Sequence, residues 1–320
     1  MKLFVGIDGG GTKTEFLVCD ENGTPLIRFR KGPGNPVDIG IDNCMAVLES
    51  GIREIKEVFP DIVIQSVYAG LAGGISGNNR QLVYDGLKAL LPAETMVGNS
   101  TDALNQLLYE CPGQDAGAVI AGTGTVGMSK KAEEVRFFGG YGYLLDRGGS
   151  GYDYGRDALY HALCDADGRR ERTLIRQLLE EELGDIRKRI PEIYAKGKPY
   201  IASFAPVVFR AYKQGDKVAE EIIRSNTKEL ANLFNSIAAH QAMEVCQVVL
   251  AGSVFGSFEI IKKYLDDYLE SEFRFILSDA APVYGTVMQA AVQAGVQDIR
   301  RFKENLTIGL LKSDKTEETI

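Results

Sequence analysis

Short apolar runs alternate with amphipathic segments along the first hundred residues. Runs of strand length occur at residues 3–8, 15–19, 25–31 and 62–69. Between them, apolar residues recur at helical spacing over 38–58, and this predicts a helix that ends before Pro60. A second helix is expected at 78–91, a short strand near 95–98 and a third helix at 102–109. This alternation of strands and helices is typical of an α/β domain.

The second part of the chain repeats this opening pattern. A strand is expected at 116–121, followed by the turn Gly122-Thr123-Gly124-Thr125 and a return strand at 126–130. Later elements are a strand at 248–253, a helix at 257–270, a strand at 273–278 and a helix at 284–297. Pro112-Gly113 interrupts the pattern, so we expect domains at 1–113 and 114–320, with the last helix free to pack back on the first domain.

The first strand leads into a glycine-rich turn whose residues suit the binding of an anion. Asp8 is followed by Gly9, Gly10 and Gly11, and then by Thr12 and Lys13, before an extended segment starts. Backbone N–H groups of residues without Cβ can approach an anion closely. The dinucleotide-binding fingerprint and the Walker A loop both require a following helix, so neither fits. A phosphate-binding hairpin is the favoured interpretation, and a plain glycine hairpin is the alternative.

Composition narrows the functional classes. The chain has 320 residues, 45% of them hydrophobic, which is enough for two domains with substantial cores. The formal net charge of −8 argues against nucleic acid as the main partner. No apolar run has the length of about 20 residues that crosses a membrane, and no secretory signal is visible. Five scattered cysteines without a C-x-x-C pair fit reduced thiols in the cytoplasm.

Taken in order, these motifs resemble the actin-fold phosphotransferases, the superfamily of sugar kinases, actin and heat-shock chaperones. Within it, the chain is similar to the N-acetylglucosamine kinase branch, which includes the BadF/BadG/BcrA/BcrD-type ATPases. Gly6–Thr14 and Ala121–Thr125 resemble its two phosphate motifs, and Ala251–Val254 resembles its adenosine motif. Segments 69–73 and 282–286 resemble the two connecting segments, and 139–152 resembles the sugar-binding block. The resemblance implies two duplicated actin-like, ribonuclease H-like α/β domains around a nucleotide cleft.

The resemblance also implies roles for individual residues. Asp102 would be the general base, with a helix-start carboxylate as the alternative, and Asp8 would hold a hydrated Mg²⁺, with a hairpin-capping aspartate as the alternative. ATP would be bound by Gly9, Gly10, Gly11, Thr12, Lys13, Gly122, Thr123, Gly124, Thr125, Ala202, Gly252 and Ser253. The sugar would be bound by Asn35, Gly140, Tyr141, Gly142 and either Asp146 or Arg147. An ordinary Asn-Pro turn is the alternative for Asn35.

One departure from the family pattern bears on the substrate. The branch usually has Gly-Asp-Glu-Gly-Ser in the sugar block, and its substrate-binding aspartate aligns with Arg147. Either Asp146 replaces it after a shift of one residue, or Arg147 selects a sugar with an acidic group. N-Acetylmuramic acid, N-acetylglucosamine and glucosamine are therefore all open as substrates.

The expected function is an ATP- and Mg²⁺-dependent, cytoplasmic amino-sugar kinase that binds neither nucleic acid nor membrane. The sequence leaves open whether the chain forms a homodimer. Two alternatives share the fold. One is an ATPase activator of an acyl-CoA reductase or dehydratase, with an iron–sulfur cluster on cysteines such as Cys111. The other is a non-catalytic sugar sensor.

Overall fold

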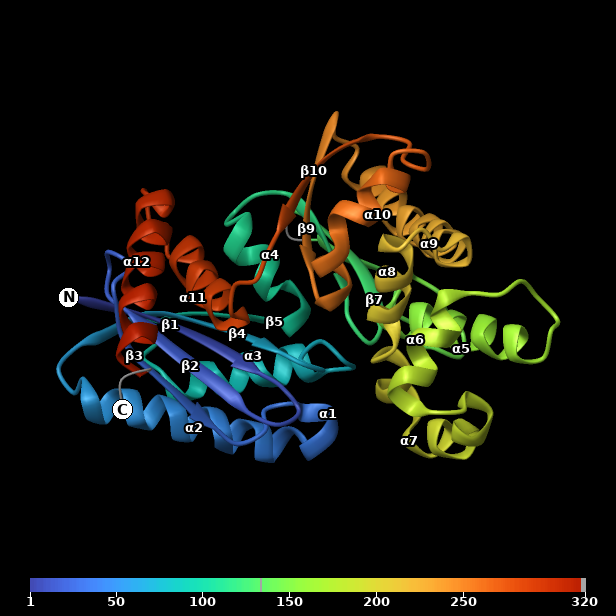
Figure 1. The fold of residues 1–320 in the computed structure, drawn as a ribbon. Coiled ribbons are helices and arrows are strands. Elements are labelled where there is room, and N and C mark those ends of the chain that lie inside the picture. The colour runs from blue at the N-terminus through green and yellow to red at the C-terminus, as the bar shows by residue number, and fades with distance from the viewer. Residues whose placement is uncertain (133, 318–320) are drawn as a thin grey trace. The chain divides into compact units, whose positions relative to one another are not determined.

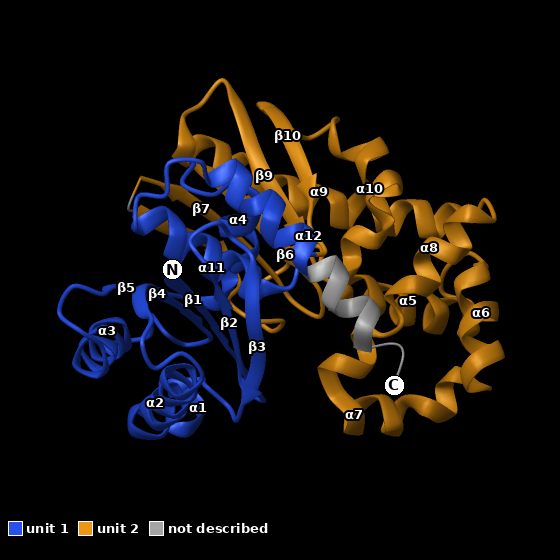
Figure 2. Cartoon of the chain, turned by 90° about the vertical axis from the view of Figure 1, so that its left-hand side faces the viewer, with its two compact units in different colours: residues 1–114, 280–320 blue, residues 115–279 orange. Residues whose placement is uncertain are grey.

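The computed structural model describes residues 1–132 and 134–317, and these form two compact units (Figure 2). Unit 1 consists of residues 1–114 and 280–320, and unit 2 consists of residues 115–279. The first division lies one residue from the boundary expected at 113. Residues 280–320 differ from the expectation, because the whole segment and not only the last helix belongs to unit 1.

Unit 1 contains a five-stranded sheet with the order β3-β2-β1-β4-β5 (Figure 1). Strands β1 and β2 form an antiparallel hairpin, β3 pairs antiparallel with β2, and β4 and β5 continue the sheet parallel to β1. The strands are β1 (Lys2–Gly9), β2 (Thr14–Cys19), β3 (Pro25–Lys31), β4 (Val63–Leu71) and β5 (Met96–Ser100). The carboxyl ends of β1, β4 and β5 therefore meet at one edge of this sheet.

Helices cover both faces of this sheet, and β1 shows why. Leu3, Val5 and Ile7 alternate along the strand and join a core formed with helices α2 (Ile41–Val58) and α3 (Asn79–Leu90). The opposite face of β1 contacts α11 (Pro282–Gln293) and α12 (Ile299–Glu317), where Phe4 packs edge-on against Phe302. The remaining elements of this unit are α1 (Pro36–Ile39), η1 (Asp102–Leu104) and α4 (Asn105–Glu110).

Two glycines explain why α11 belongs to unit 1. A Cβ on Gly6 of β1 would lie 2.4 Å from the backbone nitrogen of Val287, so the helix contacts the strand backbone directly. A Cβ on Gly285 of α11 would lie 1.6 Å from the carbonyl oxygen of Asn105 in α4. This close packing depends on residues far apart in sequence, and it is why the expected second domain ends earlier than 320.

Unit 2 repeats the sheet of unit 1. Its order is β10-β9-β6-β7-β8, which has the same connectivity when read from β8. The strands are β6 (Ala116–Ala121), β7 (Thr125–Lys131), β8 (Glu134–Gly139), β9 (Val245–Ala251) and β10 (Glu272–Leu277). The sequence did not predict β8, which is an edge strand without a fully buried side. The predicted α/β class with two duplicated domains is confirmed.

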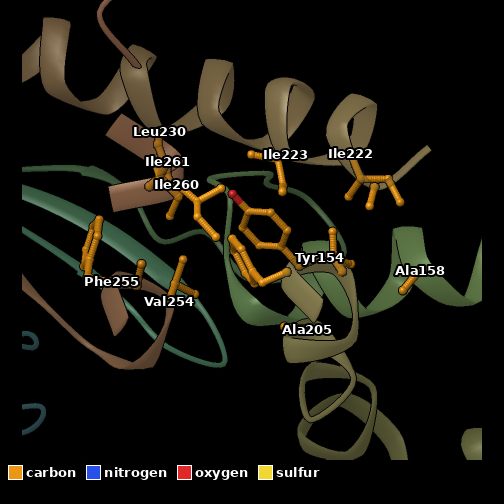
Figure 3. Packing of buried hydrophobic residues seen from close by; sticks show 14 of the residues in the cluster. Tyr154, Ala158, Ala205, Ile222, Ile223, Leu230, Val254, Phe255, Ile260 and Ile261 are labelled. Carbon is orange, nitrogen blue, oxygen red and sulfur yellow. The ribbon is translucent and has the colours of Figure 1, made fainter. Parts of the chain in front are cut away.

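A helical layer packs on this second sheet around a large buried core. Figure 3 shows Tyr154 of α5 among side chains from α8, α9, η3 and α10. The helices are α5 (Gly151–Ala166), α6 (Leu174–Leu183), η2 (Ile186–Arg189), α7 (Ile190–Ala202), α8 (Ala205–Lys213), α9 (Lys217–Gln241), η3 (Ser253–Ser257) and α10 (Phe258–Leu265). Within the described part of the chain, no helix combines the length and apolarity needed to cross a membrane.

Candidate active site

Two carboxylates lie at the strand-end edge of the sheet in unit 1. Asp8 is near the end of β1, and its Oδ1 accepts a 2.7 Å hydrogen bond from Nδ2 of Asn105. Asp102 begins the short helix η1 just after β5, where Thr101 caps the helix by accepting from the N–H of Ala103. The parallel pairing of β1 with β4 and of β4 with β5 brings these sequence-distant aspartates to one edge.

The surroundings of both aspartates disfavour their charged forms. The pKa of Asp8 is raised to about 6: burial is the largest cause, the hydrogen bond from Asn105 opposes the shift, and the negative charge of Asp102 contributes to it. Burial also raises the pKa of Asp102, against the hydrogen bond from Thr101. Interacting carboxylates with raised pKa values are typical of functional sites.

The residues of this edge also fit a magnesium ion. Asp8 is a partly buried carboxylate whose negative charge is disfavoured, and a bound cation would stabilise that charge. Within residues 1–132 and 134–317, no group of three His, Cys, Asp or Glu is placed to hold a metal ion. Mg²⁺ does not need one, because it keeps several waters and is usually held by one or two carboxylates plus substrate phosphates.

The first glycine turn connects β1 and β2. Gly9 is closely packed, since a Cβ there would lie 2.5 Å from Cδ2 of Leu71 and that side chain would have to shift. Gly10 is different: a Cβ there would have only the carbonyl oxygen of Lys13 near it, at 3.7 Å. Gly11, Thr12 and Lys13 are exposed. Packing within the protein therefore does not require glycine at position 10. A ligand that comes close to this backbone would require it.

Asn35 lies beside this turn, on the loop before α1. Its Oδ1 accepts from the N–H of Val37 at 3.0 Å, and its Nδ2 donates to Asp38 at 2.7 Å. The same Oδ2 of Asp38 also faces the turn, since a Cβ on Gly11 would lie 3.1 Å from it. Asn35 thus caps α1, and the same side chain is placed near the glycine turn.

The second glycine turn connects β6 and β7 in unit 2. The N–H of Gly122 donates to the carbonyl of Gly124 at 2.9 Å, and the N–H of Gly151 donates to the carbonyl of Gly122 at 2.7 Å. The start of α5 is thereby fixed to the turn. A Cβ on Gly122 would have no atom within 4 Å, and a Cβ on Gly124 would meet only Nζ of Lys198, at 3.2 Å. Again, packing does not explain these glycines.

A cavity of about 470 Å³ adjoins this second turn. It brings together four of the predicted nucleotide-binding residues: Gly122, Thr123, Ala202 and Ser253. Gly252 precedes η3 with φ +99°, and a Cβ there would lie 2.5 Å from the carbonyl oxygen of Ala121. Gly252 therefore lets the chain turn tightly against β6 and places Ser253 at the cavity. The volume is within the range of about 300–1,000 Å³ that is usual for small-molecule sites.

A smaller cavity of about 70 Å³ adjoins the later residues of the turn, Gly124 and Thr125. Its lining joins the turn to the predicted sugar-binding block, to Asp153 of α5 and to Lys198 of α7, and the full set is Gly124, Thr125, Gly140, Gly142, Tyr143, Asp146, Gly148, Ser150, Asp153 and Lys198. Asp146 accepts from the N–H of Tyr141 at 3.3 Å. Tyr141 itself is 72% exposed.

Arg147 does not line either cavity. Its guanidinium donates to Oδ2 of Asp157 at 2.7 Å and lies 3.8 Å from Oδ1 of Asp153. Both partners belong to α5. Of the two residues left open by the sequence, Asp146 therefore lines the smaller cavity, whereas the side chain of Arg147 pairs with carboxylates of the neighbouring helix α5.

Two residues of this geometry were missed by sequence reasoning. Asn105 is fully buried and holds Asp8, but its position on a short helix gave no signal of this contact. Lys198 lies in Gly197-Lys198-Pro199, a break inside a helical stretch. That break was visible in the sequence and could have drawn attention to the lysine.

The chain is similar in sequence and in fold to several known proteins. A family model described as the BadF/BadG/BcrA/BcrD ATPase family matches residues 5–290. The chain is 30% identical over 252 residues to the N-acetyl-D-glucosamine kinase of Dictyostelium discoideum, covering 74% of this chain and 79% of the relative. It is 29% identical over 304 residues to the N-acetylmuramic acid/N-acetylglucosamine kinase of Clostridium acetobutylicum, covering 87% and 91%. Among solved structures, the ROK hexokinase of Thermus thermophilus has the same fold, with a TM-score of 0.56 and 19% identity over 91% of this chain and 99% of that one.

Proposed function

Since this chain belongs to the BadF/BadG/BcrA/BcrD ATPase family, we propose that it is an ATP-dependent kinase that phosphorylates a hydroxyl of an amino sugar. The observation that carries the proposal is the cavity of about 470 Å³ beside the turn with Gly122 and Thr123. It joins the phosphate-binding turn to Ala202 and Ser253, which the sequence assigned to the same nucleotide.

The glycine turn of each unit is proposed to bind phosphate. Gly10 and Gly122 have open space where a Cβ would project, so a phosphate oxygen can approach their backbone. Thr123 adds a hydroxyl donor at the larger cavity. Lys13 supplies a positive charge at the exposed first turn.

Asp102 is proposed to accept the proton of the attacking sugar hydroxyl. The hydroxyl of Thr101 donates a hydrogen bond to the Asp102 carboxylate and so orients it. The same hydroxyl oxygen accepts from the N–H of Ala103 and caps η1. Asp8, held by Asn105, is proposed as the Mg²⁺ ligand, and the ion would neutralise phosphate charge during phosphoryl transfer. The two carboxylates thus have separate tasks, although they lie at one sheet edge.

Sugar recognition in unit 2 is proposed to involve the exposed Tyr141 and Asp146. Asp146 is favoured over Arg147 because it lines the smaller cavity, whereas Arg147 is paired with Asp157. This arrangement supports a neutral amino sugar, such as N-acetylglucosamine, as the first substrate to test. It leaves N-acetylmuramic acid and glucosamine as the next candidates.

Neither alternative function is favoured by a specific observation. Cys111, the cysteine closest to the predicted boundary, is only 2% exposed, and a cluster shared with a partner chain needs an accessible thiol. A sugar sensor does not need a partly buried base such as Asp102 beside a second carboxylate.

A screen of ADP release tests the proposal. Purified protein with ATP and Mg²⁺ is offered N-acetylglucosamine, glucosamine, N-acetylmuramic acid or glucose, and ADP is measured by a coupled assay. We expect release that depends on one of the amino sugars, with a slow background in the control without sugar. ADP release at the same rate with and without each of the four sugars would contradict the proposed kinase activity and favour an ATPase. Sugar binding without ADP release would favour a sensor.

A further inference from the structure

We propose that Lys198 binds the terminal phosphates of ATP at the second glycine turn. This inference rests on the proposed kinase function. It adds a cation from a segment outside the two phosphate motifs. Lys198 comes from α7, a helix that is separate in sequence from both the turn and the adenosine motif.

A break in α7 places this lysine. Gly197 has φ +65° and ψ −153°, which is outside helical geometry and favours glycine. Pro199 follows Lys198 directly, and proline cannot continue the hydrogen bonding of the preceding turn. Lys198 is therefore held between two helical segments, half-buried.

The ammonium group of Lys198 lies next to the turn. Its Nζ would be 3.2 Å from a Cβ on Gly124, and it is 5.6 Å from the centre of the Tyr143 ring. Among the residues whose side chains are described, Lys198 forms no ion pair, whereas Lys196 on the same helix pairs with Glu192 at 2.7 Å. Thr125, which lines the same small cavity, has a buried hydroxyl oxygen without a hydrogen-bond partner. A cation and an unpartnered hydroxyl thus converge on one place.

The order of residues along the turn indicates which phosphates meet this cation. Gly122 and Thr123 line the larger cavity, and Gly124 and Thr125 line the smaller one with Lys198. A nucleotide with its adenosine in the larger cavity would extend its phosphates along the turn toward Lys198. The α-phosphate would be reached first, and the terminal phosphates would lie near the ammonium group. Lysine is a common point-charge ligand for phosphate.

Calorimetry with matched variants tests this assignment. Lys198→Ala, Lys198→Arg and the control Lys196→Ala are titrated with ATP, with AMP and with the amino sugar that the parent phosphorylates. Lys196→Ala removes the same charge from the same helix, away from the turn. For Lys198→Ala we expect the Kd for ATP to rise about tenfold to a hundredfold, as for a lost charge-assisted hydrogen bond. Its Kd for AMP and its thermal midpoint without ligand should stay unchanged, and Lys198→Arg should recover part of the ATP affinity.

Other results would overturn the assignment in distinct ways. An unchanged ATP affinity in Lys198→Ala, while the parent phosphorylates its sugar, would remove Lys198 from the site and leave the kinase function intact. An equal loss for ATP and AMP, or the same loss in Lys196→Ala, would indicate a general effect on the unit. A weaker affinity for the sugar alone would assign the cation to the sugar. A parent protein that binds no ATP would overturn this inference and the proposed function together.

Discussion

At the scale of single residues, Asp8 and Asp102 share an environment that disfavours the charged carboxylate. Both are partly buried, and both have a pKa above the ordinary value because burial disfavours the carboxylate. Each keeps one polar partner, Asn105 for Asp8 and Thr101 for Asp102. Their charges also interact, so the ionisation of one affects the other.

Replacing Asp102 by asparagine tests its role as base. The change keeps the shape and removes the proton acceptor, so we expect kcat for sugar phosphorylation to fall by about 10²–10⁴. Because the pKa of Asp102 is raised, the parent should also lose activity on the acid side as pH falls through that value. Calorimetry should show unchanged ATP affinity. Near-normal turnover of the variant would contradict the assignment.

Replacing Asp8 by asparagine should change how stability depends on pH. The folded chain binds this proton more tightly than the unfolded chain, because burial raises the pKa from 3.8 to about 6. Ionised Asp8 therefore lowers stability as pH rises through this window, and the loss is complete above it. Without ATP or Mg²⁺, Asp8→Asn should raise Tm at about pH 7.5, and the gain should shrink at about pH 4. Thermal scans of both proteins at both pH values measure this, and an equal gain at each pH would exclude this origin.

At the scale of elements, the contact between α4 and α11 supports the site in unit 1. Gly285 allows α11 to approach the backbone of Asn105, and Asn105 in turn holds Asp8. A Cβ on Gly70 of β4 would lie 1.9 Å from Oδ1 of Asn105, so this strand also requires glycine there. The two connecting segments of the sequence thus have a packing role around one asparagine.

Gly285→Ala tests this contact. The added Cβ would lie 1.6 Å from the Asn105 carbonyl oxygen, so α11 must move, and overpacking of this kind costs about 1–3 kcal/mol or more. Urea unfolding should show this loss, and sugar phosphorylation should fall because Asn105 shifts. The control is Gly32→Ala in the same unit, where a Cβ would meet no atom within 4 Å. Equal stability of the two variants would show that the helices move apart without cost.

At the scale of the whole molecule, the two units differ in how the chain builds them. Unit 2 is one continuous segment, 115–279, whereas unit 1 needs 1–114 together with 280–320. The late segment supplies α11 and α12, which cover one face of the first sheet, including Gly6 and Phe4 of β1. Unit 1 therefore cannot complete its packing until the end of the chain is present.

A chain that ends at Asp279 should accordingly lose the cooperative unfolding of unit 1. Removing α11 and α12 exposes apolar surface of the first sheet, while every element of unit 2 is kept. Limited proteolysis followed by mass spectrometry should show cleavage throughout residues 1–114 and protection within 115–279. A chain that ends at Glu317 is the control and should behave like the parent. Equal protection of both regions in the shorter chain would contradict this dependence.

Local patterns in the sequence determined most elements of both sheets and the two glycine turns. Strand β3 was predicted at 25–31, where the structure has it, because strand and helix periodicity follow from which side of a segment is buried. Strand β8 was not predicted, since an edge strand in a glycine-dense segment has no fully buried side and little periodicity. The residue types of the turns, Asp8 and Asp102 were likewise visible without a structure.

Only the tertiary structure decided which distant residues meet. Asn105 contacts Asp8 across 97 positions of the chain, and α11 joins unit 1 through glycines that each look ordinary alone. Arg147 pairs with Asp157 on α5, whereas its sequence neighbour Asp146 lines the smaller cavity. Periodicity records burial against a neighbour but not which neighbour it is. Side-chain partners, and with them the position of each charge at the site, depend on how the separate elements pack.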